Sequence, residues 1–155
     1  MAYLGREGGD VVDAEGAYSS IRRAALSISE ELGVPVNATS VPLTEDYRHD
    51  LDGMLKAITP KTKIVVITNP NNPTGTLLSF EEIERFVNAV PKEVIIVIDE
   101  AYIHFGRDLN YQRAMPLAMT NDNVIVIRTF SKAYGMAAMR VGYAVCSQAI
   151  QQKLS

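Results

Sequence analysis

Four short segments of the chain are apolar and rich in β-branched residues at nearly every position, instead of alternating with polar residues. They span residues 63–68, 93–99, 123–129 and 141–146. Continuous apolar character over this length is typical of strands buried on both faces, as in a parallel or mostly parallel sheet. Residues 10–14 form a further strand candidate, and residues 34–43 predict an edge strand.

Segments with helical spacing lie between these strands. Residues 17–33 and 50–58 each place apolar side chains three and four positions apart. The clearest helix is predicted over residues 79–90, where Ser79 and Glu82 match a capping box. Strands that alternate with helices indicate right-handed βαβ units. The pattern therefore predicts an α/β fold, with an open, mostly parallel sheet covered by helices on both faces.

Composition and charge narrow the class of protein. A chain of 155 residues with 47% hydrophobic and 21% charged residues suffices for one domain with a core. A net charge of -3 favours neither nucleic acid nor an anionic membrane as a partner. No apolar stretch approaches membrane-spanning length, and the first residues lack the apolar region of a signal peptide. The lone Cys146 cannot form an internal disulfide, so we expect a cytoplasmic protein.

Polar residues with chemical potential follow three of the predicted strands. The segment NPNNPTG, residues 69–75, follows the first strand, and Asp99 and Tyr102 follow the second. Lys132 follows the third, in a turn that also carries hydroxyl groups and a glycine. In open α/β sheets the ligand crevice lies beyond the carboxyl ends of the strands. We therefore expect these residues to meet at one edge of the sheet.

Each of these groups also has an ordinary structural interpretation. NPNNPTG can be a rigid turn, Asp99 a helix cap and Lys132 a surface lysine. As a functional group, Asp99 would face a cationic ring nitrogen or a metal, and no His or Cys at ligand spacing accompanies it, so no metal is expected. Glu100 should point to the opposite side of its strand from Asp99. His104 is expected to be a partly solvated loop residue and not a catalyst.

Lys132 decides between the two interpretations. Lysine forms Schiff bases with carbonyl compounds once desolvation or a nearby cation lowers its pKa. Arg140, eight residues further on, can supply a positive field and can also bind a phosphate. A lysine, a carboxylate facing a pyridinium nitrogen and a phosphate-binding arginine are the groups that an electron-sink cofactor of the pyridoxal type requires.

Three segments together resemble one known family. NPNNPTG, DEAYIHF and TFSKAYGMAAMRVGY, in this order, are similar to motifs of the pyridoxal-phosphate-dependent aminotransferases of fold type I, class I/II. The histidinol-phosphate aminotransferase-like branch is the nearest match, and the resemblance extends over residues 9–145. It implies pyridoxal 5′-phosphate as cofactor, amino acids and 2-oxo acids as substrates, and a biosynthetic role in amino-acid metabolism. It also implies a homodimer.

The resemblance assigns roles to individual residues. Lys132 would form the internal Schiff base and then move the proton between Cα and C4′. Asp99 would pair with the pyridine nitrogen, while Tyr102 and Asn72 would hydrogen-bond the 3′ oxygen. The remaining expected cofactor ligands are those that grip the phosphate and the aromatic residue that stacks on the ring, namely Thr129, Ser131, Arg140 and Tyr18.

The sequence also departs from the family in ways that leave alternatives open. Family members are much longer, so residues 1–155 are expected to form a partial cofactor-binding large domain, without the N-terminal segment and the C-terminal small domain. His104 stands where the histidinol-phosphate branch commonly has an acidic residue, so histidinol phosphate is only one candidate amino donor. The motifs define the cofactor and not the fate of the substrate. A pyridoxal-phosphate-dependent lyase or decarboxylase, and a non-catalytic fragment, are the alternatives.

Overall fold

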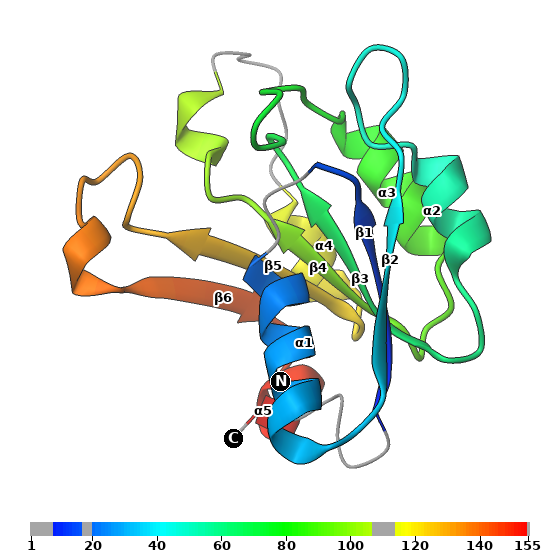
Figure 1. The fold of residues 1–155 in the computed structure, drawn as a ribbon. Helices are drawn as coiled ribbons and strands as arrows, with labels where there is room; N and C mark the ends of the chain where they lie inside the picture. Colours follow the sequence, from blue (N-terminus) through cyan, green and yellow to red (C-terminus); the bar gives the residue numbers. More distant parts are fainter. Residues whose placement is uncertain (1–7, 17–19, 107–113, 155) are drawn as a thin grey trace.

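The computed structural model describes residues 8–16, 20–106 and 114–154. Within them, one six-stranded sheet has the strand order β2-β1-β3-β4-β5-β6 (Figure 1). Neighbouring strands run parallel except at β5 and β6, which pair antiparallel. The strands are β1 (Gly9–Ala14), β2 (Val36–Val41), β3 (Thr62–Thr68), β4 (Ile95–Asp99), β5 (Val124–Thr129) and β6 (Gly142–Cys146).

Helices cover both faces of this sheet, which confirms the predicted fold class. Side chains of α2, α3 and α4 pack into the core on one face, and side chains of α1 and α5 pack into the core on the other (Figure 1). Two short 3-10 turns follow β4 and precede β6. The helical elements are α1 (Ser20–Leu32), α2 (Leu51–Ala57), α3 (Phe80–Ala89), η2 (Ile103–Phe105), α4 (Met115–Thr120), η3 (Ala137–Met139) and α5 (Gln148–Leu154).

The uninterrupted apolar runs of the central strands have the predicted cause. Along β3, Val65 and Ile67 belong to the core under α2, α3 and α4, whereas Ile64 and Val66 belong to the core under α1 and α5. Successive side chains of a strand point to opposite faces, so a strand buried on both faces is apolar at every position. This places β3 in the interior, with its carboxyl end free to carry the loop of residues 69–75.

The prediction that residues 141–146 are buried on both faces is wrong. β6 runs antiparallel to β5 at the edge of the sheet, and Gly142, Tyr143 and Ala144 are exposed. Among the described residues, no further strand pairs with β6 on its outer side. Only the end of β6 reaches the two cores, where Val145 packs on one face and Cys146 on the other.

Candidate functional site

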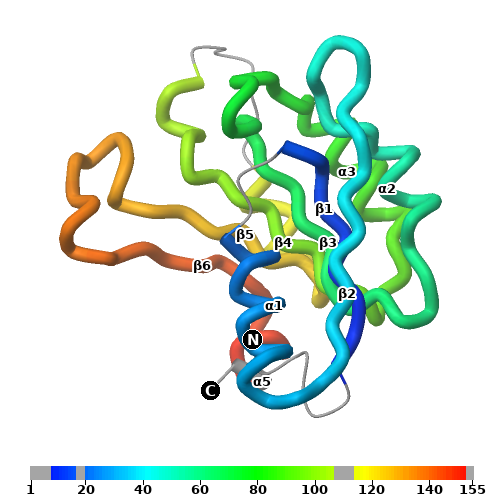
Figure 2. Tube along the Cα trace, in the orientation of Figure 1, coloured from blue at the N-terminus to red at the C-terminus, as the bar shows by residue number. Residues whose placement is uncertain are grey.

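A cavity of about 320 Å³ lies at the carboxyl ends of β3, β4 and β5. Thr68 at the end of β3 pairs with Asp99 at the end of β4, and β5 ends beside them at Thr129. Figure 2 shows the segments that follow these three strands along one edge of the sheet. The predicted site residues that line the cavity are Asn72, Asp99, Tyr102, Thr129, Ser131, Lys132 and Arg140. The remaining one, Tyr18, lies outside the described residues.

Asn72 lies in a loop that is held by its own hydrogen bonds. The buried Asn69 side chain donates to the Leu78 carbonyl at 3.2 Å and accepts from the Leu78 N–H at 2.8 Å. Within the loop, the Gly75 N–H donates to the Asn71 carbonyl at 2.8 Å. Proline fixes φ at two positions of this segment, which further restricts its backbone. The amide of Asn72 is thus carried on a well-defined bend.

Asp99 lines the cavity and has one carboxylate oxygen without a hydrogen-bond partner among the described residues. Its Oδ1 accepts the Ala101 N–H at 2.9 Å, and none of the described residues hydrogen-bonds Oδ2. Burial raises the pKa of Asp99 above its ordinary value, the Glu100 charge raises it further, and the Ala101 N–H and the Lys132 charge oppose this shift. A half-buried carboxylate with an unpaired oxygen is suited to pair with a cationic ligand.

Lys132 and Tyr102 lie side by side on the wall of the cavity. The Nζ atom of Lys132 is 5.1 Å from the centroid of the Tyr102 ring, within the range of a cation–π contact. The Lys132 charge also reaches Asp99, whose pKa it lowers against the larger effect of burial. The expected desolvation of the lysine is not provided by the described residues, because Lys132 is exposed.

Thr129, Ser131 and Arg140, the residues expected near a phosphate, differ in how many of their polar groups are already hydrogen-bonded within the described residues. Thr129 Oγ1 accepts the Ser131 N–H at 3.0 Å and lies 3.5 Å from the Val141 carbonyl, to which it donates. The Ser131 hydroxyl makes no hydrogen bond with the described residues. Within the described part of the chain, Arg140 donates once, to the Ala137 carbonyl at 3.1 Å, and it adopts a left-handed backbone with φ of 53°. Such a conformation is uncommon for a non-glycine residue and is enriched at functional sites.

A buried ion pair between Glu100 and Arg128, which itself lines the cavity, was not predicted from the sequence. Glu100 is fully buried, and Arg128 Nε donates to its Oε2 at 2.8 Å, with Nη2 donating to the same oxygen. The other oxygen accepts the Ala114 N–H at 2.7 Å. Asp99 therefore lines the cavity while Glu100 pairs with Arg128 in the interior, as expected for adjacent residues that point to opposite sides of a strand. The sequence did contain one indication of this ion pair: Arg128 is a charged residue in an otherwise apolar strand, and a buried charge requires a partner.

His104 is half-buried, in line with the predicted partly solvated loop histidine. Its Nε2 lies 3.3 Å from the Tyr134 hydroxyl, and the two rings pack edge-on with centroids 5.1 Å apart. This contact joins the segment that follows Asp99 to the turn that carries Lys132. A second cavity, of about 450 Å³, adjoins the first and shares Asn72 and Tyr102 with it.

The described residues form an α/β domain with a cavity whose lining includes an amine and a carboxylate, Lys132 and Asp99. The aminotransferase class I and II family matches residues 23–155. An aromatic amino acid aminotransferase of Rhodococcus opacus (strain B4) is 50% identical over 139 residues, 90% of this chain and 36% of that protein. A histidinol-phosphate aminotransferase of Bacillus velezensis is 47% identical over 114 residues, 74% of this chain and 32% of that protein.

Solved structures give the same result. The histidinol-phosphate aminotransferase of Sinorhizobium meliloti in complex with pyridoxal-5′-phosphate superposes with a TM-score of 0.77 and 31% identity, over 94% of this chain and 38% of that one. The chain therefore belongs to the class I and II aminotransferases. It spans about a third of the length of the curated relatives it matches. None of the helices in the described part of the chain has the length and apolar character needed to cross a bilayer.

Proposed function

We propose that this chain is part of the cofactor-binding large domain of a pyridoxal-phosphate-dependent aminotransferase. The reaction moves an amino group between an amino acid, or an amino-alcohol phosphate such as histidinol phosphate, and a 2-oxo acid. One observation carries the proposal: the Lys132 amine, the Asp99 carboxylate and the Asn72 amide line a single cavity at the ends of three parallel strands. This is the ligand-binding edge of an open α/β sheet.

The side chains that line the cavity fit pyridoxal phosphate. Asp99 Oδ2, which has no hydrogen-bond partner among the described residues, would face the ring nitrogen, and Lys132 Nζ would bind the aldehyde carbon covalently. When bound, the cofactor supplies an electron sink for the negative charge that develops at the substrate Cα. Asp99 would keep the ring nitrogen protonated, because an adjacent carboxylate favours the cationic form. The Lys132 amine would be the base that accepts the proton from the substrate Cα.

Hydrogen-bond donors at two further places would orient the ring. Asn72 and Tyr102, which line both cavities, would donate to the 3′ oxygen. For the phosphate we assign Ser131 and Arg140, since the Ser131 hydroxyl is unpaired while Thr129 Oγ1 is engaged with the Ser131 backbone. Arginine provides several N–H donors and suits a phosphate. Thr129 would then hold the backbone of Ser131 in place through the hydrogen bond from the Ser131 N–H to Thr129 Oγ1.

The two curated relatives described above are aminotransferases, which favours amino-group transfer over the lyase and decarboxylase alternatives. Aromatic amino acids and histidinol phosphate are therefore the donors to test first, with 2-oxoglutarate as acceptor. The second cavity of about 450 Å³ offers space for a substrate side chain next to Asn72 and Tyr102. Product analysis that finds glutamate with a new 2-oxo compound supports transfer. Release of carbon dioxide or ammonia instead supports the alternatives.

We also propose that the complete protein is a cytoplasmic homodimer that acts in amino-acid biosynthesis. Support for the assembly comes from a cluster of large apolar side chains near β6 that are between 40% and 64% exposed, namely Tyr134, Met136, Met139, Val141 and Tyr143. Clusters of this kind mark protein contacts more often than free surface. Cys146 is a free thiol, which is ordinary in a reducing compartment.

The test of this function is a titration of the purified chain with pyridoxal phosphate. A lysine linked to the cofactor aldehyde absorbs in the visible range, so we expect a new band in the wild type. Lys132→Ala should abolish the band. Lys56→Ala, an exposed lysine on α2 away from the cavity, is the matched control and should leave it unchanged. A band of equal intensity in Lys132→Ala would refute the assignment of the lysine.

A further inference from the structure

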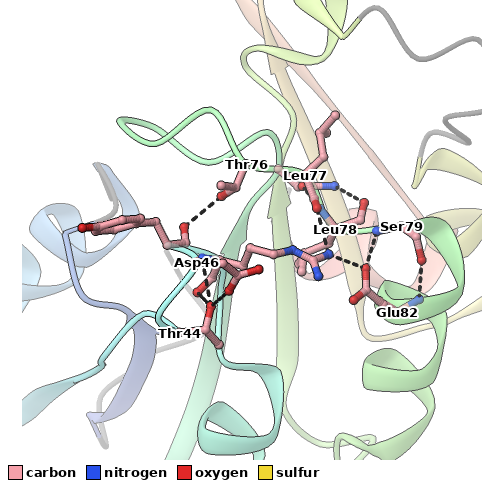
Figure 3. Close-up of polar contacts among 10 residues, drawn as sticks. Thr44, Asp46, Thr76, Leu77, Leu78, Ser79 and Glu82 are labelled. Atoms are coloured by element: carbon pink, nitrogen blue, oxygen red, sulfur yellow. Dashed lines mark hydrogen bonds and ion pairs between the residues drawn. The ribbon is translucent and has the colours of Figure 1, made fainter.

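Three consecutive residues after β2, Tyr47 to His49, contact residues on either side of the Asn72 loop. The Thr76 hydroxyl donates to the Tyr47 carbonyl at 2.9 Å, and Arg48 Nη2 donates to the Leu77 carbonyl at 2.9 Å (Figure 3). Both contacts join residues 29 positions apart in the sequence. The residues that follow the Asn72 loop are therefore hydrogen-bonded to Tyr47 and Arg48, which do not line the cavity.

The segment that makes these contacts is itself rigid. The Thr44 N–H donates to the Arg48 carbonyl at 2.9 Å, and the Arg48 N–H returns to Thr44 Oγ1 at 3.0 Å. Thr44 Oγ1 also bonds Asp46, as Figure 3 shows. Tyr47, at the tip, has a left-handed backbone with φ of 61°. A turn closed by this many internal bonds can serve as a fixed support for its neighbour.

Arg48 extends this support to the start of α3. Its Nη2 lies 2.7 Å from Glu82 Oε2, and the same oxygen accepts the Ser79 N–H at 2.7 Å (Figure 3). The guanidinium group thus joins the turn, the end of the Asn72 loop and the capping box of α3. Arginine is suited to such a position because its planar group offers five donors.

His49, the third of these residues, contacts the end of β3, where the Asn72 loop begins. It is only 4% exposed, and its Nε2 is 3.0 Å from the carbonyl of Thr68, the last residue of β3. The carbonyl can only accept, so Nε2 carries the proton. Burial lowers the pKa of His49, and the hydrogen bond to the Thr68 carbonyl partly offsets that shift. His49 Nδ1 and Asn71 Oδ1 are both buried without a hydrogen bond.

We propose that His49, assisted by Arg48, is a positioning residue that holds the Asn72 amide against the cofactor cavity. His49 contacts the Thr68 carbonyl, four residues before Asn72, and Arg48 donates to the Leu77 carbonyl, five residues after it. The segment that carries Asn72 into the cavity wall is therefore held on both sides of that residue. The proposal rests on the proposed function in one respect, the role of Asn72 as a ligand of the 3′ oxygen. A displacement of about 1 Å in a group that positions a ligand can lower the reaction rate about 100-fold.

The first test needs no cofactor. We expect the amide hydrogens of the loop, such as those of Asn71 and Gly75, to exchange faster in His49→Ala than in the wild type. His49→Gln should restore slow exchange, because its amide N–H reaches a position similar to that of Nε2. Arg48→Gln, at a half-buried position, should show a smaller effect in the same direction. Unchanged exchange in both His49→Ala and Arg48→Gln would overturn the proposal.

The second test asks whether His49 acts through Asn72. The affinity for pyridoxal phosphate and the pH midpoint of its visible band are measured in the wild type, His49→Ala, Asn72→Ala and the double variant. The loss of one hydrogen-bonded position predicts an affinity about tenfold lower in His49→Ala. Asn72→Ala and the double variant should then behave alike, in both affinity and midpoint.

The outcomes separate this inference from the proposed function. Independent, additive effects of the two substitutions would overturn the positioning role, as would a wild-type affinity and midpoint in His49→Ala. Failure of the wild type to bind pyridoxal phosphate would instead refute the proposed function. The exchange experiment would then still decide whether His49 and Arg48 hold the loop.

Discussion

Asp99 and Glu100 are adjacent carboxylates whose surroundings give them different properties. Glu100 is held by two donors from Arg128 and one from Ala114, so its charge is fully compensated inside the protein. Asp99 has one backbone donor, and its pKa is raised mainly by burial. A buried charge with incomplete pairing is costly to the folded state. We attribute this cost at Asp99 to its function, since a bound cation would remove it.

The raised pKa of Asp99 predicts a specific pH dependence of stability. The folded state holds the proton of Asp99 more tightly than the unfolded state, in which the pKa is near 3.8. The ionised group therefore destabilises the fold above its raised pKa, and this cost fades as the pH falls toward 3.8. Asp99→Asn should stabilise the apo chain at pH 7 by a margin that shrinks on acidification, while weakening cofactor binding. Urea unfolding at several pH values measures the margin.

Asp122→Asn is the control for this prediction, because Asp122 is an exposed carboxylate just before the amino end of β5. It should leave both stability and cofactor binding within experimental error of the wild type. If Asp99→Asn instead destabilises the apo chain at pH 7, then the carboxylate is well paired and our explanation of its environment fails.

At the level of elements, α3 is the helix whose boundaries are best explained by local chemistry. Ser79 Oγ accepts the Glu82 N–H at 3.2 Å, and Glu82 Oε2 accepts the Ser79 N–H at 2.7 Å. These two bonds satisfy helix N–H groups that have no partner within the helix. The start of α3 also fixes the end of the Asn72 loop, because Leu78 is bonded to Asn69.

Ser79→Ala should therefore lower the free energy of unfolding by about 1 kcal/mol, the usual contribution of an N-cap side chain. The matched control is Ser27→Ala on α1, where the hydroxyl makes only an exposed contact with Glu31 at 3.4 Å. Alanine favours helix interiors, so the control should be neutral or slightly stabilising. Equal losses in the two variants, measured by urea unfolding, would show that the capping box does not stabilise α3.

The elements also show where the sequence was sufficient and where it was not. β3 and α3 were predicted because a continuous apolar run and a capping box are local patterns. α5 was missed, since in a segment of seven residues Ile150 is the one buried side chain among those described. The exposure of β6 depends on what packs against it, which residues 141–146 do not encode. Arg128 and His49 were missed as supports of the site because their partners are distant in sequence.

At the scale of the whole molecule, the sheet brings three strand ends together and so assembles the cavity. Asn72 lies in the loop after β3, Asp99 is the last residue of β4, and Lys132 lies in the turn after β5. Their meeting follows from parallel strand order alone, which is why the edge could be predicted before the structure. Which hydroxyl is free for a phosphate could not be predicted, because it depends on the hydrogen bond between Thr129 and Ser131.

The central claim, that Lys132 holds the cofactor covalently, is tested most directly by locating the attached group. Borohydride reduction of the chain with pyridoxal phosphate makes the linkage permanent, and peptide mass mapping then identifies the modified lysine. We predict that the added mass is found on Lys132, with the other lysines largely unmodified. A modification spread evenly over the exposed lysines, or concentrated on one that lies away from Asp99, would contradict this account.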